Sequence, residues 1–366
     1  MTGKILVLGG YGNFGKRIVR ALAAKDIEVI VAGRSKAKAE AFSRSLGDDV
    51  TGRVSGIAMD VTTGLAEALM QLRPVVVVNT CGPFQGADYS VARTCIKAGV
   101  HYIDLADGRC FVTGIGVLDD AAVAAGVAVI SGASTVPGLS SAVLDHFRSE
   151  ISAFRTLKFG ISPGQKAERG LATTKGILSY VGKPFRDYPG SQGRVFGWQG
   201  LYRQAYPGLG RRWMANCEIP DLDLLPARYG LETIRFSAGL ELGVLHLGLW
   251  ALSWLVRVGI PLPLARLAGP MLAISNWFDR FGSADGGMHV IVEGLGPDGE
   301  PIRKSWFIIA KDGDGPQIPT VPAIVLAARI ARGELLRAGA YPCVGLVSLE
   351  DYLAELEGFA VGTHEM

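Results

Sequence analysis

The sequence predicts an α/β protein in which a doubly wound parallel sheet is followed by a second α+β domain built on a mixed or antiparallel sheet. Three observations support this prediction. Short β-rich runs alternate with helical segments over about the first 145 residues, and a glycine-rich turn joins the first run to the first helix. The alternation then stops near residue 150. At 366 residues the chain is long enough for two domains with substantial cores.

The first domain is predicted from short apolar runs, each followed by a turn or a polar residue. The helix after the first run has Phe14, Ile18 and Leu22 at helical spacing, so one apolar face can pack on a sheet. In parallel sheets ligands bind outside the carboxyl ends of the strands. We expect six strands, at residues 5–8, 27–32, 54–59, 75–78, 101–105 and 127–131.

The second domain is predicted from a different pattern. Residues 154–161 are typical of a strand, whereas 162–229 show little periodicity and an apolar helical segment covers 240–281. Pro297, Asp298 and Gly299 lie between two β-rich runs and predict a hairpin. Near the end, Ser348 and Asp351 form a capping box. The expected domains are residues 1–149, residues 150–312, and C-terminal helices over 313–366 that return to the first domain.

The turn Gly-Gly-Tyr-Gly-Asn-Phe-Gly at residues 9–15 is the most informative motif of the chain. Gly10, Gly12 and Gly15 have the spacing of a dinucleotide-binding turn. In such a turn one glycine allows the tight bend, one lets the pyrophosphate approach the backbone, and one lets the helix pack closely on the strand. The following helix would present unpaired amide groups to the pyrophosphate. Because a strand, this turn, a helix and a second strand follow in order, the motif indicates a Rossmann-type nucleotide site rather than a structural turn.

The end of the second strand predicts the form of the nucleotide. NAD-selective sites usually place a carboxylate there, but the sequence has Gly33, Arg34 and Ser35. Arg34, Ser35 and Lys38 are suited to charge-assisted hydrogen bonds with a 2′-phosphate, which predicts NADP(H). The alternative is that residues 34–38 only cap a solvated helix.

Loops after the later strands supply the remaining expected contacts. Asp60 and Val61 follow the third strand near the adenine position, and the loop of residues 79–84 follows the fourth, beneath the ribose and nicotinamide. Asp107, just past the fifth strand, is the candidate catalytic residue, whereas Asp104 is expected to be structural. The predicted cofactor-binding residues are Gly10, Tyr11, Gly12, Asn13, Phe14, Gly15, Gly33, Arg34, Ser35, Lys38, Asp60, Val61, Asn79, Thr80, Cys81, Gly82, Pro83 and Phe84.

Composition argues against other classes of protein. The net charge of +3 and the lack of a basic cluster with aromatics give no reason to expect nucleic acid as a partner. The five cysteines are widely separated and the five histidines are scattered, so we expect reduced thiols and no metal site. The first strand begins too early for a signal peptide, which predicts a cytoplasmic protein. Residues 242–256 are apolar but too short to span a membrane, and they leave open a peripheral membrane contact.

The first domain resembles the saccharopine dehydrogenase-like oxidoreductases. The resemblance rests on the turn at residues 9–15, on Asn79 with Gly82-Pro83-Phe84, on residues 98–105, and on Pro137-Gly138. It implies a two-domain NADPH-using oxidoreductase that is commonly dimeric. Relatives include opine-type enzymes, which reduce an imine, and trans-acting enoyl reductases. Amino-acid-handling members have Asp-Pro-Gly where this sequence has Val136-Pro137-Gly138, so it lacks a partner for an amine.

The sequence therefore predicts an NADPH-dependent reductase of a C=N or C=C bond in a hydrophobic small molecule. One alternative is an opine-type dehydrogenase with a charged substrate, for which Arg169, Lys175 or Arg203 would have to line the pocket. Another is a non-catalytic NADP-binding protein that associates with membranes through residues 242–256.

Overall fold

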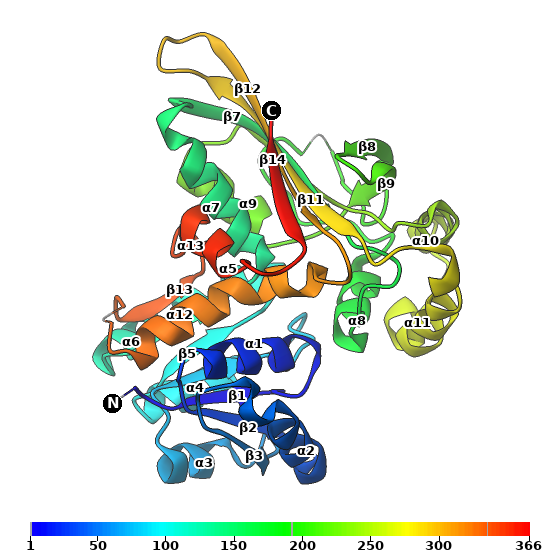
Figure 1. The fold of residues 1–366 in the computed structure, drawn as a ribbon. Helices are drawn as coiled ribbons and strands as arrows, with labels where there is room; N and C mark the ends of the chain where they lie inside the picture. The colour runs from blue at the N-terminus through cyan, green and yellow to red at the C-terminus, as the bar shows by residue number, and fades with distance from the viewer. Residues whose placement is uncertain (1, 192, 335) are drawn as a thin grey trace. The chain divides into compact units, whose positions relative to one another are not determined.

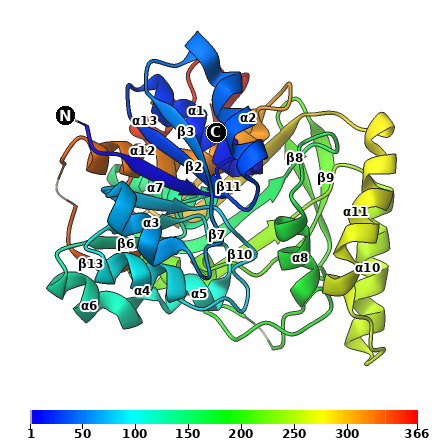
Figure 2. The same ribbon diagram turned by 90° about the horizontal axis from the view of Figure 1, so that it is seen from below.

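The computed structural model describes residues 2–191, 193–334 and 336–366 and divides into two compact units. Unit 1 extends to Ala142 and resumes over Gln317–Glu355, while unit 2 comprises Val143–Pro316 and Leu356–Met366. Each unit is built on its own sheet, and Figures 1 and 2 show them in two views. The expected boundaries at 149/150 and 312/313 differ from the divisions at 142/143 and 316/317, and Leu356–Met366 lies in unit 2 although it was expected to return to the first domain.

Unit 1 contains a parallel sheet of seven strands in the order β13-β6-β5-β4-β1-β2-β3. The order reverses on either side of β1, so the chain switches direction between β1 and β4. All residues of β1, β4 and β6 are buried, which explains why these strands could be recognised as apolar runs. The strands are β1 (Ile5–Leu8), β2 (Val29–Gly33), β3 (Val54–Ala58), β4 (Val76–Asn79), β5 (His101–Asp104), β6 (Ala128–Ser131) and β13 (Gly339–Pro342).

Helices cover both faces of this sheet. Buried Ile18, Val19 and Leu22 form the inner face of α1, which packs beside α12, and α3 and α4 contact each other on the opposite face (Figure 1). The helices are α1 (Asn13–Ala24), α2 (Lys36–Leu46), α3 (Leu65–Leu72), α4 (Ser90–Lys97), α5 (Arg109–Thr113), α6 (Asp119–Ala124), α12 (Val321–Ala331) and α13 (Leu349–Ala354), with α7 (Ser140–His146) at the division between units. Short helical turns are η1 (Gly47–Asp49), η2 (Ile115–Leu118), η3 (Thr135–Leu139) and η7 (Gly315–Thr320).

Unit 2 contains a mixed sheet of seven strands in the order β14-β12-β11-β7-β10-β9-β8. Only the β7–β10 pair is parallel among these described strands, and the others are antiparallel. The predicted hairpin is β11 and β12, whose register pairs Gly286 with Ala310. The strands are β7 (Ala153–Ser162), β8 (Tyr202–Tyr206), β9 (Gly210–Asn216), β10 (Thr233–Ala238), β11 (Gly286–Leu295), β12 (Pro301–Ala310) and β14 (Val361–Glu365).

The helices of unit 2 include the apolar segment, which forms two helices separated by the prolines at 261 and 263. Both helices stand together at one side of unit 2, next to α8 (Figures 1 and 2). No helix of the described chain is both long and apolar enough to cross a membrane. The helical elements are η4 (Phe147–Ser149), α8 (Leu171–Tyr180), α9 (Asp221–Tyr229), α10 (Gly243–Arg257), η5 (Leu264–Leu267), α11 (Ala268–Trp277) and η6 (Asp279–Phe281).

The fold class agrees with the prediction of a doubly wound parallel sheet plus a mixed sheet. Two parts of the expected C-terminal region differ, because helices alone were expected over 313–366. Residues 339–342 form β13 and add a seventh strand to the first sheet, and residues 361–365 form β14 in the second sheet. Neither segment has the apolar alternation of a half-buried strand, because β13 has only four residues and β14 is almost wholly exposed.

Candidate functional site: the carboxyl edge of the parallel sheet

The glycine turn joins β1 to α1 at the point where the strand order reverses. The backbone N–H groups of Gly9 and Gly10 both donate to the Ala32 carbonyl at the end of β2, over 2.9 and 3.2 Å. Gly9 adopts a positive φ of 72°, so the left-handed residue of the turn is Gly9 rather than Gly10. The Gly12 N–H then donates to the Gly9 carbonyl over 2.8 Å and closes the turn.

The three motif glycines meet different surroundings. A Cβ at Gly15 would lie 2.2 Å from the Gly9 carbonyl oxygen, and one at Gly10 would lie 3.0 Å from the Val7 oxygen. At Gly12 the added atom would approach only the Gly9 oxygen, at 3.0 Å. Gly10 and Gly15 therefore allow the turn to pack against the protein, whereas Gly12 leaves one side of the backbone uncovered.

The N-terminus of α1 is suited to an anion. Gly12 is the N-cap and supplies no side-chain hydrogen bond, and the first turn contains no acidic residue. Its leading N–H groups therefore lack the side-chain cap that often satisfies a helix start. Predicted contacts Asn13 and Phe14 open this helix, and the side chain of Asn13 accepts a hydrogen bond from Arg17. This uncovered turn and uncapped helix start fit the pyrophosphate of a dinucleotide.

Arg34 is the exposed cation at the end of β2. It makes no hydrogen bond or salt bridge with any residue that the structure describes, and Lys38 is exposed on the first turn of α2. The hydrogen bonds of Thr62, and to a smaller extent the charge of Arg34, lower the pKa of Asp60 after β3. The charge of Arg34 also acts on Cys81 after β4. The charge of the Arg34 guanidinium therefore acts on groups at the carboxyl edge of the sheet, and the guanidinium is exposed there, as a phosphate ligand would require.

Ser35 and Tyr11 have structural roles beside Arg34. The Ser35 hydroxyl caps α2 by accepting from the Lys38 N–H over 3.3 Å, as the cap-only alternative anticipates for this residue. The Ser35 N–H donates to the Tyr11 hydroxyl over 3.2 Å. A Cβ at Gly33 would lie 2.3 Å from the Tyr11 ring, so Gly33 is needed for this ring to lie across the end of β2. The capping role leaves the Ser35 hydroxyl one hydrogen to donate to a ligand.

Asp60 and Val61 form the turn that follows β3. The Asp60 carboxylate accepts from the backbone N–H and the hydroxyl of Thr62, over 2.9 and 2.6 Å. Val61 is partly buried against the hydrophobic core. Their predicted contact with adenine stays a prediction.

Hydrogen bonds from the sheet and within the loop fix the position of residues 79–84. Buried Asn79 donates to the Tyr102 hydroxyl over 3.1 Å and accepts from the Cys81 N–H over 3.0 Å. The Thr80 hydroxyl donates to the Leu8 carbonyl over 2.8 Å, which fixes this loop beside the glycine turn. These bonds make Asn79 and Thr80 positioning residues of the loop.

The rest of this loop presents backbone and a thiol. Desolvation raises the pKa of the Cys81 thiol to about 11, although the residue has an exposed surface, so the sulfur is protonated at neutral pH. The Gly82–Pro83 peptide is cis. Phe84 is buried, with its ring centroid 5.3 Å from that of Phe111, so its side chain anchors the loop in the core.

Two aspartates follow β5 and differ in their surroundings. Asp104 is fully buried, and its Oδ1 accepts from the Ala106 N–H, the Ser131 hydroxyl and the Gly132 N–H, over 3.0, 2.9 and 2.9 Å. Burial raises the pKa of Asp104 to about 6 despite these hydrogen bonds. Asp104 therefore ties the loops after β5 and β6 together, in agreement with the expected structural role.

Asp107 is only partly buried and lies in the loop beyond Asp104. Its Oδ1 accepts from the Gln85 side chain over 2.9 Å, which joins the loops after β4 and β5. Burial raises the pKa of Asp107 above the ordinary aspartate value, while the hydrogen bond from Gln85 lowers it. Gln85 was not identified from the sequence, because nothing about a glutamine after Phe84 distinguishes it from an ordinary loop residue.

The basic residues that would recognise a charged substrate lie in unit 2. Arg169 donates to the Ser275 hydroxyl over 2.8 Å and forms a salt bridge of 2.5 Å with Asp279. The Arg203 guanidinium lies over the Trp213 ring at 4.9 Å, and Lys175 is exposed on α8. Arg169 therefore already has a counter-ion. Among the described residues, no group of three histidine, cysteine, aspartate or glutamate side chains is placed to hold a metal ion.

Comparison with known proteins supports the reading of unit 1. Residues 5–136 match the family model of the saccharopine dehydrogenase NADP-binding domain. No curated protein sequence matches the chain. The fold is similar to that of apo saccharopine dehydrogenase (L-Glu forming) from Saccharomyces cerevisiae, with a TM-score of 0.64, 14% identity and 100% of both chains covered. An amine dehydrogenase from Mycobacterium smegmatis covers 93% of this chain and 95% of its own, with 13% identity and a TM-score of 0.49. The family match confirms the predicted cofactor, NADP(H), and the predicted class, an NADP-dependent oxidoreductase.

Proposed function

Because residues 5–136 match the family model of the saccharopine dehydrogenase NADP-binding domain, we propose that the protein uses NADPH to reduce a C=N or C=C bond of a hydrophobic small molecule. The observation that carries the proposal is the character of the sheet edge beyond the glycine turn. Burial raises the pKa of Asp107 in the loop after β5, so this part of the edge disfavours a charged carboxylate. Bound NADPH would supply the hydride, and the protein would supply orientation, a dry environment and a proton.

The binding roles follow from the geometry of unit 1. The uncovered turn at Gly12 and the start of α1 would hold the pyrophosphate, and Arg34 with Lys38 would hold the 2′-phosphate. Gly33, Asp60 and Val61 would border the adenosine half. The loop of residues 79–84 would lie under the ribose and nicotinamide, with Asn79 and Thr80 fixing its position. These contacts use the anion-binding properties of a helix start and of guanidinium groups.

Asp107 is the proposed proton donor. Reduction of a C=N or C=C bond by hydride leaves a negative charge on the other atom, so a proton must be delivered there. A carboxyl with a raised pKa retains its proton closer to neutral pH than an exposed aspartate does. The hydrogen bond from Gln85 holds the carboxyl in one orientation and leaves Oδ2 for the substrate.

Two features favour an apolar substrate over an amino acid. The loop after β6 has buried Val136 before Pro137 and Gly138, so an amine would lack the carboxylate of the amino-acid-handling enzymes. In addition, Arg169, a candidate for holding a substrate carboxylate, is paired with Asp279. Leaving a charged substrate group unpaired in a buried site costs several kcal/mol, on the order of what burying a few methylenes returns.

Paired substrate panels test the proposal. One panel contains hydrophobic enoyl and imine compounds, and the other contains amino acids with 2-keto acids. We expect NADPH oxidation with the first panel and a large loss of kcat in Asp107→Asn, with NADPH affinity retained. Turnover only of charged amine and keto-acid pairs would instead support the opine-type alternative.

The remaining parts of the proposal concern location and assembly. We expect a cytoplasmic protein that forms a homodimer, as the resemblance implies, and light scattering of the purified chain measures the dimer directly. A non-catalytic NADP-binding protein is the second alternative. It predicts NADPH binding without turnover of either substrate panel.

A further inference from the structure

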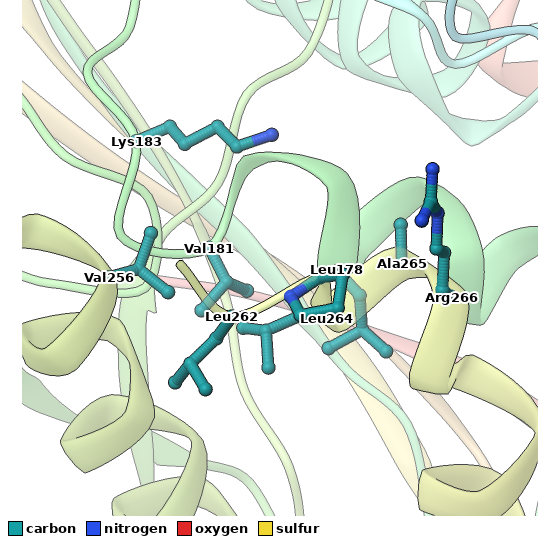
Figure 3. A pocket seen from close by; sticks show the side chains of 9 residues that line it. Leu178, Val181, Lys183, Val256, Leu262, Leu264, Ala265 and Arg266 are labelled. Atoms are coloured by element: carbon teal, nitrogen blue, oxygen red, sulfur yellow. The ribbon is translucent and has the colours of Figure 1, made fainter. Parts of the chain in front are cut away.

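A pocket in unit 2 has an apolar floor and a cationic rim. Its volume is about 190 Å³, and it lies between α8, the end of α10 and η5. Leu178, Val181 and Leu264 are buried in its floor, and Val256 and Leu262 complete the apolar wall. Figure 3 shows Lys183 and Arg266 reaching past these side chains toward one side of the pocket.

The two rim cations have no counter-ion. Lys183 and Arg266 are exposed, and neither forms a salt bridge or side-chain hydrogen bond with any residue the structure describes. Unpaired cations beside an apolar pocket complement a molecule with an apolar chain and an anionic head. Because the site needs both parts, an uncharged hydrophobic ligand or a free phosphate would satisfy only one of them.

The neighbouring helices expose an unusually apolar surface. Trp277 is 74% exposed, Val258 69% and Val244 65%. Other large apolar side chains exposed on α10, α11 and the turns around them are Leu247, Trp254, Leu255, Ile260, Leu267, Ile274 and Phe281. Large exposed apolar side chains gathered on neighbouring helices are typical of binding sites for partners or membranes.

Charge distinguishes between these occupants. Residues 242–282 contain three arginines and one aspartate, Asp279, whose carboxylate already pairs with Arg169. Two of the arginines stack on exposed aromatic rings: Arg257 lies 4.7 Å from the Trp254 centroid and Arg280 lies 4.6 Å from that of Phe281. Cations, tryptophans and aliphatic side chains on one helical surface are typical of helices that lie in a lipid interface.

We propose that α10, α11 and this pocket form a docking surface for a bilayer containing anionic phospholipid, with one lipid headgroup held by Lys183 and Arg266 and the adjoining part of one acyl chain in the pocket. The aromatic and aliphatic side chains of α10 and α11 then insert beside that lipid. This inference is independent of the reductase activity, because every residue in it belongs to unit 2 and none is among the residues proposed to bind the nucleotide.

Vesicle co-sedimentation of the full-length protein tests the proposal. We expect binding to phosphatidylcholine vesicles containing phosphatidylglycerol, and little binding to pure phosphatidylcholine. Reversing both rim charges, in Lys183→Glu with Arg266→Glu, should weaken the partition coefficient by at least about tenfold, since each cation near an anionic surface contributes measurably to binding. Trp277→Ser should weaken it as well, without changing the charge.

A matched control separates local recognition from net charge. Lys158 on β7 and Arg211 on β9 are exposed cations outside the pocket. The double variant Lys158→Glu with Arg211→Glu changes the net charge by the same amount as the rim variant. It should retain vesicle binding, and NADPH titration of all variants should give the wild-type affinity and so report intact folding. Equal losses in the control and rim variants would overturn the proposal.

Other occupants of the surface give different results. If Trp277→Ser dissociates a dimer in light scattering and the wild-type protein does not co-sediment with anionic vesicles, the surface is an interface between copies of the chain. If the pocket binds a soluble anionic amphiphile but vesicles do not compete, it serves a free ligand. Either result would contradict the membrane proposal.

Discussion

The glycine turn of unit 1 and the α10–α11 surface of unit 2 are both exposed, but they expose opposite chemistries. At Gly12 the chain leaves polar backbone uncovered next to an uncapped helix start and an unpaired Arg34. At Trp277 and Ile274 it leaves large apolar side chains uncovered. The first arrangement suits a charged nucleotide, and the second suits a hydrophobic partner. The comparison indicates that the two units meet different molecules, and each of the following experiments tests one side of it.

The largest effect is expected at Gly12. Its backbone is extended, with φ −75° and ψ 179°, so a residue with a side chain can adopt it. The added Cβ would approach one backbone atom, the Gly9 oxygen at 3.0 Å, and the rest of the side chain would enter the space proposed for the pyrophosphate. Gly12→Val should weaken NADPH binding by more than about 100-fold, because the turn would no longer admit the phosphates. Calorimetric titration measures the loss, and a melting temperature close to that of the wild type shows that unit 1 still folds. An unchanged NADPH affinity would show that the nucleotide does not bind at this turn.

A smaller effect is expected from the buried carboxyl of Asp104. Its folded pKa of about 6 lies above the unfolded value near 3.9, so the folded state holds the proton more tightly. This group therefore favours the folded state most below pH 4, and that contribution is lost as pH rises through 6. Two pKa units correspond to about 3 kcal/mol.

Denaturant unfolding of the wild type and Asp104→Asn between pH 4 and 7 measures this contribution. The difference in unfolding free energy between the two proteins should change by about 2–3 kcal/mol across that range, in favour of the variant as pH rises. A difference that does not vary with pH would show that Asp104 has an ordinary pKa.

Arg34 should have an intermediate effect that depends on the nucleotide. Arg34→Ala should weaken NADPH binding by about 10- to 100-fold, which corresponds to one or more charge-assisted hydrogen bonds, and should leave NADH binding unchanged. Lys36→Ala is the matched control, since Lys36 already pairs with Glu40. Equal losses for NADPH and NADH would mean that Arg34 does not contact the 2′-phosphate.

The smallest effect is expected on the apolar surface. Ile274→Ser should change the unfolding free energy by less than about 0.5 kcal/mol, because the side chain is 59% exposed and supports no core. Leu264→Ala, in the buried floor of the pocket, should cost about 2–4 kcal/mol. A large loss in Ile274→Ser would show that another part of the protein covers this surface in solution.

The same comparison explains what could be predicted from the sequence. The strands of the parallel sheet were recognisable because both faces are buried, which produces short apolar runs such as Ile5–Leu8. The glycine spacing was recognisable because backbone clearance at Gly15 and ligand access at Gly12 impose it locally. The positive φ at Gly9 was missed because the motif itself begins at Gly10.

Features that depend on tertiary contacts could not be predicted. The role of Gln85 as the partner of Asp107 and the role of β14 as an added strand both require partners that are distant in sequence. The apolar character of α10 was evident, but an apolar run predicts burial as readily as exposure. Only the structure distinguishes buried Leu264 from exposed Trp277.

Transfer of deuterium from NADPH labelled at the nicotinamide C4 tests the proposed function most directly. With a hydrophobic enoyl or imine acceptor, mass spectrometry of the product should find one deuterium on carbon, and the label should be absent when Gly12→Val replaces the wild-type protein. Transfer of the label only to products of amino acids and keto acids, or to no product of either class, would contradict the proposal.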